Sequence, residues 1–225
     1  MTDQELRLGL GALADRVFEA VVFDLDGTLI DSTPAVLRSW ATWTYEHGLT
    51  PEDQAGFHGV PSASVVRALL PAGRHDAAIA RINELEIADV SDIVVLPGAV
   101  EALEALRDAK NAIATSCDRR LARARIAATN LAPPSVLVTA DDVTNGKPAP
   151  DPFLEAARRL QVDPANCLVV EDSPMGLQAA RAAGCATLAV ITTTPAEELM
   201  ADAVVNTLAD VRFEAAPDGI RVREA

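Results

Sequence analysis

The sequence predicts an α/β protein whose core is a doubly wound parallel sheet covered by helices on both faces. Short apolar runs typical of buried strands alternate with stretches of helical periodicity, an alternation typical of parallel sheets. Of the 225 residues, 49% are hydrophobic, which is enough for a large core. The alternation breaks between residues 34 and 95, where helical patterns follow one another. We therefore expect a small helical domain inserted after the first strand.

Six apolar runs predict the strands of the sheet. They are 21–23, 112–115, 136–139, 167–170, 186–191 and 204–205. Helical patterns between them lie at 98–109, 119–130, 152–160 and 174–183. A capping residue followed by proline predicts three helix starts, and a glycine predicts one helix end. These signals are Thr33-Pro34, Asp151-Pro152, Ser173-Pro174 and Gly184.

The predicted domain boundaries follow from the break in the alternation. We expect the sheet domain to comprise residues 17–33 and 96–225, and the helical cap domain to comprise residues 34–95. Residues 1–16 form an N-terminal extension, either loose or a short helix. A capped site needs no second subunit, so a monomer is expected.

Composition excludes several classes of protein. The net charge of −14 argues against a nucleic-acid partner, which usually needs a basic face. No apolar run approaches the roughly 18 residues of a membrane span, and the acidic N-terminus lacks a signal-peptide core. Three cysteines without metal-ligand spacing are expected to be reduced thiols. These features predict a cytoplasmic protein without a membrane partner.

Two acids and a glycine follow the first predicted strand, in the run Asp24-Leu25-Asp26-Gly27-Thr28. A buried strand has no structural need for two acids at its end. Isolated carboxylates are costly to remove from water, so a metal ion or a reaction is the expected reason for them.

Polar residues also follow the other predicted strands at this edge, where ligands collect in parallel sheets. They are Thr115-Ser116, Lys147 and Glu171-Asp172. Acids at two strand ends can hold Mg²⁺, which prefers oxygen ligands, and Asp24 can act as a carboxylate nucleophile. Lys147 adds positive charge for a phosphate. Together these groups predict phosphoryl transfer.

These four motifs resemble, in order and spacing, those of the haloacid-dehalogenase-like phosphohydrolases over roughly residues 18–195. The residues that flank these motifs are most similar to those of the sugar-phosphate and polyol-phosphate phosphatases, a subgroup close to the β-phosphoglucomutases. The resemblance implies a Mg²⁺-dependent phosphatase of a small sugar or polyol phosphate. It also implies that the helical insert is a cap over the substrate.

The resemblance implies a role for each motif residue. Asp24 forms an aspartyl-phosphate, and Asp26 protonates the leaving alcohol and then activates water. Asp24, the carbonyl of Asp26, and Asp172 bind Mg²⁺, with Glu171 supporting the metal directly or through water. The residues expected to hold the phosphate or the substrate are Gly27, Thr28, Thr115, Ser116, Lys147 and, in the cap loop, His58, with Ser62 as another candidate there.

Two other functions stay open. A mutase of the β-phosphoglucomutase type would return the phosphoryl group to another hydroxyl. Those enzymes carry an aliphatic residue at the position of Thr28 and a basic cap residue near Ser62, so hydrolysis is favoured. A phosphate-binding regulatory module would have lost one of the two acids, and both are present.

A motif after the second predicted strand suggests a different chemistry. Cys117 and Arg123 have the spacing of a thiol phosphatase loop, yet the stretch lacks glycine and continues as a helix. We therefore expect Cys117 to be a packed thiol beside the site.

Overall fold

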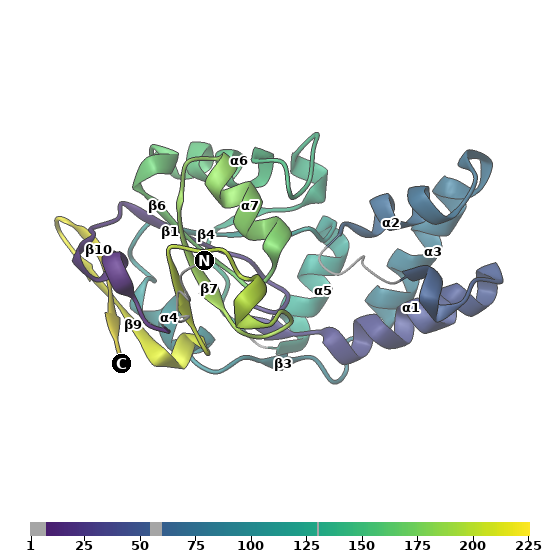
Figure 1. Cartoon of the computed structure of the whole chain (residues 1–225), viewed down its shortest axis with the longest axis horizontal. Helices are drawn as coiled ribbons and strands as arrows, with labels where there is room; N and C mark the ends of the chain where they lie inside the picture. Colours follow the sequence, from purple (N-terminus) through teal and green to yellow (C-terminus); the bar gives the residue numbers. More distant parts are fainter. Residues whose placement is uncertain (1–7, 55–59, 130) are drawn as a thin grey trace, which may run out of the picture.

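The computed structural model describes residues 8–54, 60–129 and 131–225, and over these residues the chain forms a six-stranded parallel sheet. Its spatial order is β5-β4-β1-β6-β7-β8 (Figure 1). The strands are β1 (Ala20–Phe23), β4 (Asn111–Ala114), β5 (Val136–Val138), β6 (Cys167–Glu171), β7 (Ala186–Val190) and β8 (Ala203–Val205). The predicted fold class is confirmed. The strand order runs outward from β1 in both directions, which places the switch point of the sheet at β1.

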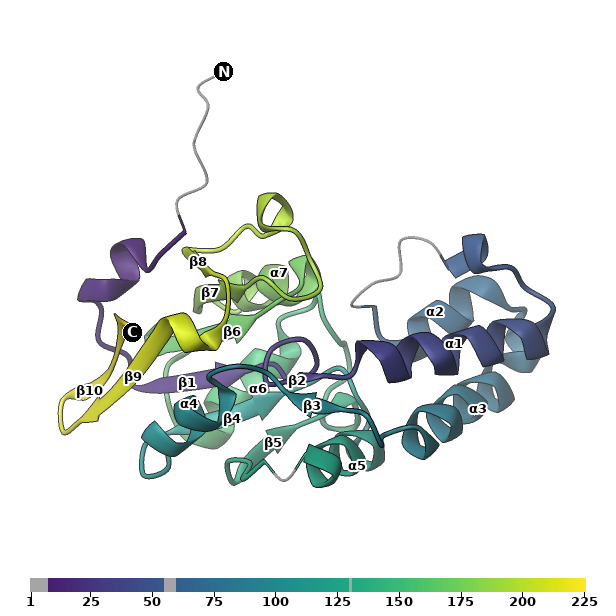
Figure 2. The ribbon, with the colours of Figure 1, turned by 90° about the horizontal axis from the view of Figure 1, so that it is seen from below.

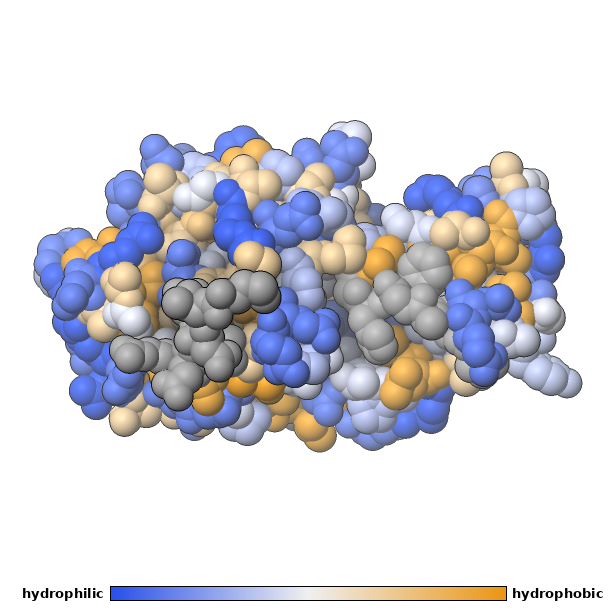
Figure 3. Space-filling view, viewed as in Figure 1, coloured by the Kyte–Doolittle hydropathy of each residue, from blue (hydrophilic) through white to orange (hydrophobic). Residues whose placement is uncertain are grey.

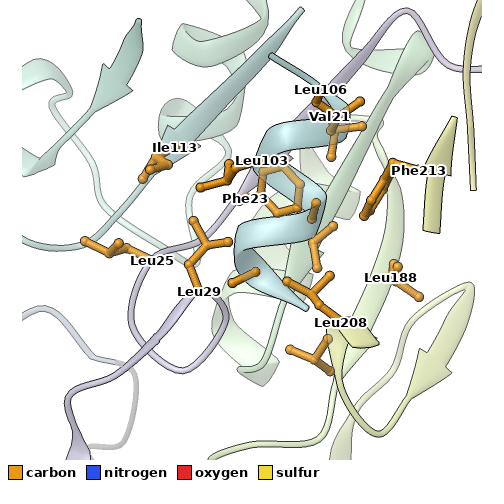
Figure 4. Packing of buried hydrophobic residues seen from close by; sticks show 14 of the residues in the cluster. Val21, Phe23, Leu25, Leu29, Leu103, Leu106, Ile113, Leu188, Leu208 and Phe213 are labelled. Carbon is orange, nitrogen blue, oxygen red and sulfur yellow. The ribbon is translucent and has the colours of Figure 1, made fainter. Parts of the chain in front are cut away.

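Helices cover both faces of the sheet. They are α4 (Ala99–Ala105), α5 (Arg119–Thr129), α6 (Asp151–Leu160) and α7 (Pro174–Ala182). Alternate residues of β1 enter different cores: Phe23 packs with Leu103 in the cluster that includes α4 and α5, and Val22 packs with Phe153 in the cluster that includes α6 and α7. Figure 4 shows Phe23 beside α4 and near Phe213. Burial on both faces explains why the strand sequences are almost wholly apolar.

The helix ends agree only in part with the predicted signals. Ser173 caps α7, because its hydroxyl accepts a hydrogen bond of 3.1 Å from the N–H of Gly176, and Gly184 follows the helix at φ +85°. Thr33 and Asp151 were predicted as caps, and this was wrong: each is the first residue of its helix. The N–H of Thr33 donates instead to the Asp31 carboxylate, at 2.9 Å.

Three helices form the region between β2 (Ile30–Asp31) and β3 (Val94–Val95), which pair with each other antiparallel. They are α1 (Thr33–His47), α2 (Ser62–Leu69) and α3 (His75–Ala88). We call α1–α3 the helical insert. Its small core surrounds Trp43, whose indole N–H donates to the carbonyl of Ala78 at 2.9 Å. Figures 1 and 2 show the insert beside the sheet, on the side to which β1 leads. The domain boundaries at 34 and 95 stay a prediction.

The C-terminal part of the chain forms a hairpin that was not predicted. Strands β9 (Val211–Ala216) and β10 (Gly219–Glu224) pair antiparallel and lie at the opposite end of the molecule from the insert (Figures 1 and 2). The ring of Phe213 meets that of Phe23 edge-on, with 5.7 Å between centroids. Within the predicted N-terminal extension, Leu10 and Leu13 are buried in the same core. Short 3₁₀ helices complete the fold, at Gly11–Asp15, Pro51–Gln54, Ala72–Arg74, Ala140–Asp142, Pro164–Asn166, Ala196–Glu198 and Leu208–Asp210.

The surface and the interior differ in how their polar residues are distributed. Figure 3 shows hydrophilic and hydrophobic residues interspersed over one face. Among the described residues, no helix combines the length and the apolar character needed to cross a bilayer. The interior, in contrast, buries several charged side chains: Asp24, Glu86, Arg125, Lys147, Glu171 and Asp172.

Candidate active site

The ends of three neighbouring strands bring the predicted site residues together. Asp24 follows β1, Thr115 follows β4, and Glu171 ends β6. Because β1 lies between β4 and β6, these side chains start from adjacent positions at one edge of the sheet. The N–H of Asp24 donates to the carbonyl of Val170 at 2.9 Å, which fixes the backbone from which the carboxylate projects.

Three carboxylates and one ammonium form the buried site cluster, made of Asp24, Lys147, Glu171 and Asp172. One oxygen from each of the three carboxylates lies within 4.8 Å of the others. Lys147 Nζ lies 2.5 Å from Asp24 Oδ1 and 2.8 Å from Glu171 Oε1. With all groups ionised, three negative charges face one positive charge, and burying such an excess is costly.

The pKa values reflect this crowding. Burial raises the pKa of Asp24 to about 7, with Glu171 and Asp26 adding to the rise and Lys147 opposing it. Burial, and then the neighbouring carboxylates, also hold the pKa of Asp172 well above its usual range. Burial alone would lower the pKa of Lys147, yet Asp24 and Glu171 raise it above its ordinary value. The cluster therefore has a deficit of positive charge.

A hard divalent cation fits this set of donors. Mg²⁺ prefers carboxylate oxygens, and a cluster of three buried acids offers them. Among the described residues, Asp24 Oδ2 and Asp172 Oδ1 have no hydrogen-bond partner, whereas Asp172 Oδ2 accepts a hydrogen bond from the Thr193 hydroxyl. Two of the acids thus have an oxygen left to offer to a metal ion.

Glu171 is already engaged by the protein itself. Its Oε2 accepts hydrogen bonds from the backbone N–H groups of Asp172 and Ser173, at 2.7 and 2.6 Å, and its Oε1 accepts one from Lys147. Gly176 makes room for this carboxylate, since a Cβ there would lie 1.6 Å from Glu171 Oε1. Glu171 therefore holds the lysine and the start of α7 in place.

Gly27 allows the loop after β1 to approach Asp172. Its φ is +86°, and a Cβ at this position would lie 2.1 Å from Asp172 Oδ2. Glycine satisfies both demands, the left-handed backbone and the close approach. Glycine is therefore needed at position 27 for structural reasons that do not involve a substrate.

The other predicted substrate-binding residues differ in burial and in their hydrogen bonds. Thr115 is buried, and its hydroxyl oxygen accepts a hydrogen bond of 3.1 Å from the N–H of Cys117. Ser116 is partly exposed. Thr28 is buried, and its hydroxyl has no hydrogen-bond partner among the described residues. His58 lies outside the described residues.

The segment that leads into α2 reaches the lysine loop. A Cβ on Gly146, the residue before Lys147, would lie 3.2 Å from Pro61 Cγ. Ser62, the other candidate in the cap loop, is the first residue of α2. This part of the helical insert therefore lies next to the site.

Asp26 belongs to a second group of contacts. Its Oδ1 accepts hydrogen bonds from the Ser32 hydroxyl at 2.7 Å and from Arg125 Nη1 at 2.8 Å. Its Oδ2 accepts one from Cys117 Sγ at 3.1 Å, so Cys117 is a packed thiol beside the site, as predicted. Burial raises the pKa of this thiol, which is unlike the lowered pKa of a thiol nucleophile.

Arg125 was missed by the sequence analysis. The arginine is 4% exposed, and its Nη2 lies 3.4 Å from Oε1 of Glu86, which is also 4% exposed. A signal was present in the sequence: position 125 lies on the same face of α5 as the buried Leu121 and Ala122. A charged residue within such an apolar stripe calls for a buried partner.

The acids that follow the third predicted strand serve the fold. Asp142 accepts hydrogen bonds from Arg119 at 2.5 and 2.6 Å and from Arg159 at 2.7 Å. Burial would raise the pKa of Asp142, yet hydrogen bonds from Arg159 and Thr139 hold it well below its usual range. Arg119 is therefore occupied by an ion pair.

A protein-family model matches residues 18–184, and its description is haloacid dehalogenase-like hydrolase. The chain belongs to this family. The match spans β1 to the end of α7, and so includes every element that carries the site cluster. The predicted family is confirmed, and with it the predicted class of enzyme, a phosphoric monoester hydrolase.

Similar proteins include named phosphatases. Hexitol phosphatase A of Escherichia coli (strain K12) is 40% identical over 206 residues, which cover 88% of this chain and 95% of that protein. A fructose-1-phosphate phosphatase of the same organism is 32% identical over 180 residues, covering 74% and 93%. Among solved structures, a hydrolase from Pseudomonas syringae superposes with a TM-score of 0.78 at 27% identity, covering 85% of this chain and 95% of that one.

Proposed function

We propose that the protein is a Mg²⁺-dependent phosphatase that hydrolyses a small sugar phosphate or polyol phosphate. The observation that carries this proposal is the buried contact between Asp24 and Lys147 at the switch point of the sheet. It joins a carboxylate nucleophile to a phosphate-binding ammonium. The substrate class is supported by the relatives named for hexitol and fructose 1-phosphate.

Asp24 and Asp26 carry the chemistry in this proposal. A carboxylate oxygen of Asp24 forms a bond to phosphorus while the bond from phosphorus to the ester oxygen breaks, giving an aspartyl-phosphate. Asp26 gives its proton to the departing alcohol oxygen. Asp26 then takes a proton from water, which attacks phosphorus and releases phosphate from Asp24.

The remaining residues hold the transferred group. Lys147 supplies fixed positive charge, and Glu171 keeps the lysine aimed into the cluster. Hydroxyl and backbone N–H groups of Thr115 and Ser116 hold phosphate oxygens, and we assign a supporting contact to the buried hydroxyl of Thr28, which has no hydrogen-bond partner among the described residues. We assign substrate contact also to the loop of Gly27 and to His58 in the cap loop.

Asp24, the carbonyl of Asp26, and Asp172 would hold Mg²⁺, with Glu171 in support. The chemistry that such an ion supplies is neutralisation of negative charge on the phosphoryl oxygens. It would also relieve the excess of carboxylates in the site cluster. The expected monomer, the cytoplasmic location and the absence of a nucleic-acid or membrane partner stay predictions.

A kinetic panel tests the proposal. Phosphate release is measured from sorbitol 6-phosphate, fructose 1-phosphate, glycerol 1-phosphate, ribose 5-phosphate and p-nitrophenyl phosphate, with Mg²⁺ and after chelation. We expect release from at least one sugar or polyol ester, loss on chelation, and recovery with Mg²⁺. An Asp24→Asn variant is expected to lose at least about 10⁴-fold in kcat.

Asp218→Asn is the matched control, because it changes a surface carboxylate that is paired with Arg221. It should be as active as the parent protein. An active Asp24→Asn variant, or turnover that is indifferent to chelation, contradicts the proposal. Glucose 1-phosphate with its bisphosphate is assayed separately, and formation of the 6-phosphate without phosphate release would favour the mutase.

A further inference from the structure

A second buried cluster joins the helical insert to the sheet domain, and we call it the junction cluster. It consists of Asp26 after β1, Cys117 after β4, Arg125 on α5 and Glu86 on α3. Arg125 lies at its centre: Nη1 donates to Asp26 Oδ1 at 2.8 Å and to Cys117 Sγ at 3.2 Å, and Nη2 lies 3.4 Å from Glu86 Oε1. One guanidinium thus contacts both parts of the molecule.

A neighbouring contact follows the same path from the insert to the sheet domain. Asn83, one turn before Glu86 on α3, donates to Asp118 Oδ2 at 2.9 Å. Asp118 Oδ1 in turn accepts the N–H of Leu121 in the first turn of α5. Helix α3 therefore packs against α5 through polar contacts on one face, spaced as i and i+3.

The junction cluster is poorly satisfied for a purely structural network. Glu86 Oε2 and Arg125 Nε are buried and have no hydrogen-bond partner among the described residues. Buried charges with unmet hydrogen bonds are costly, and apolar residues of similar volume would stabilise such a position as well or better. A role beyond folding would account for this cost.

The contacts on Asp26 point to a role in orienting this carboxylate. Arg125 and Ser32 hold one of its oxygens, and Cys117 holds the other, so the carboxylate has one fixed orientation. An oriented carboxylate is what proton transfer to a leaving group requires. Arg125 controls that orientation while it also contacts the insert.

We propose that Arg125 is a positioning residue for Asp26, and that Glu86 couples this positioning to the docked helical insert. The inference rests on the proposed function, in which Asp26 passes the proton. When the insert is docked, Glu86 and Asp26 hold Arg125 from opposite sides. The contact that positions the proton donor is therefore shared with the insert through Glu86.

Two esters separate this role from a structural one. The alcohol that leaves glycerol 1-phosphate needs a proton, whereas p-nitrophenolate leaves without one. The value of kcat/KM reports the steps up to departure of the leaving group. Removing the positioning of Asp26 must therefore slow the alkyl ester selectively, whereas general damage to the site slows both esters.

The experiment compares kcat/KM for the two esters in three arginine variants. Arg125→Gln is expected to lower the alkyl value by about 10- to 100-fold and the aryl value by less than about 3-fold. Arg125→Lys keeps the charge and should recover part of the loss. Arg123→Gln, an exposed arginine on the same helix, is the matched control and should change neither value.

An equal fall for both esters, or no fall, overturns the positioning role. Thermal unfolding checks that each variant folds, and Arg125→Lys gives the same comparison if Arg125→Gln does not fold. Failure of the proposed function is distinguishable, because the parent protein itself would then fail to hydrolyse the esters.

Glu86→Gln tests the coupling to the insert. It is expected to lower the alkyl-to-aryl ratio by about 3- to 10-fold in the parent background. In the Arg125→Gln background it should have no further effect, because Glu86 acts through the arginine. Equal effects in both backgrounds, or an unchanged ratio in the parent, overturn this part of the proposal.

Discussion

The site cluster and the junction cluster are both buried groups of charges, yet they differ in balance. In the site cluster three carboxylates face one ammonium, and burial raises the pKa values of Asp24 and Asp172. In the junction cluster two carboxylates share one guanidinium that bridges two parts of the molecule. An excess of carboxylates calls for a metal ion, whereas a nearly balanced cluster needs none. The balance of charges thus separates a candidate metal site from a cluster that links two parts of the molecule.

The largest effect on stability is expected from removing the positive charge of the site cluster. Lys147→Met leaves Asp24 and Glu171 buried without their ammonium, which should lower the free energy of unfolding by about 3–5 kcal/mol. Activity should fall by about 10²–10³-fold. Denaturant unfolding and phosphate release measure the two effects. Lys110→Met, at the other lysine of the chain, is an exposed control, and equal stability of the two variants would break the comparison.

A smaller effect is expected from crowding Asp172. Gly27→Ala places a Cβ 2.1 Å from Asp172 Oδ2, so the carboxylate must move. We expect Mg²⁺ affinity to fall by about 10- to 100-fold, the range typical when a metal ligand is displaced by its neighbours. Titration calorimetry measures this loss.

A Gly184→Ala variant separates the effect of the steric clash at position 27 from the effect of backbone strain. Gly184 has nearly the same φ, +85°, but nothing lies within 4 Å of its Cβ position. Both variants should lose about 1 kcal/mol of stability from strain, and only Gly27→Ala should bind the metal more weakly. Similar metal affinities in the two variants would show that Gly27 does not set the position of Asp172.

The smallest expected effect tests the junction cluster by pH. Burial raises the pKa of Glu86 from 4.5 to about 7, with Asp26 and Asp118 adding to the rise and Arg125 opposing it. The folded protein therefore holds this proton more tightly than the unfolded chain does. The stability from that proton is fully present below about pH 4.5 and is lost as pH rises towards 7.

The parent protein should therefore lose roughly 1–2 kcal/mol relative to Glu86→Gln between pH 4.5 and pH 7. Denaturant unfolding of both proteins across this range, in the presence of a chelator, measures the difference. A difference that stays constant with pH would mean that Glu86 titrates normally and that the junction is better hydrated than its burial indicates.

Most of the sheet was predictable because its strands are buried on both faces. Such strands must be continuous apolar runs, so Val21–Phe23 and 167–170 could be identified without any knowledge of their neighbours. The C-terminal hairpin has only one face on the core and therefore alternates, as Val211 and Phe213 show. Its turn signal, Asp218-Gly219, was present in the sequence but was not used.

The residues of the two clusters also differ in how readily they can be predicted from the sequence. Each residue of the site cluster lies at the end of a strand or in the loop after one, and the topology of a parallel sheet brings such positions to one edge. Arg125 lies 99 residues from Asp26, on a helix with several other arginines. Only tertiary packing distinguishes it from the solvent-exposed arginines of the same helix. Glu86 likewise looks like any other acid on a polar helix. Partners that tertiary packing selects leave little trace in a single sequence.

The antiparallel contact of β2 with β3 has a consequence for how this enzyme can change. Ile30 pairs with Val95 and Asp31 with Val94, so the chain departs from the sheet domain and rejoins it at adjacent residues. The length of the segment between these residues can therefore change without altering the sheet domain. The insert is in this sense an exchangeable module, because its helices can differ while the carboxylates at the end of β1 keep their places.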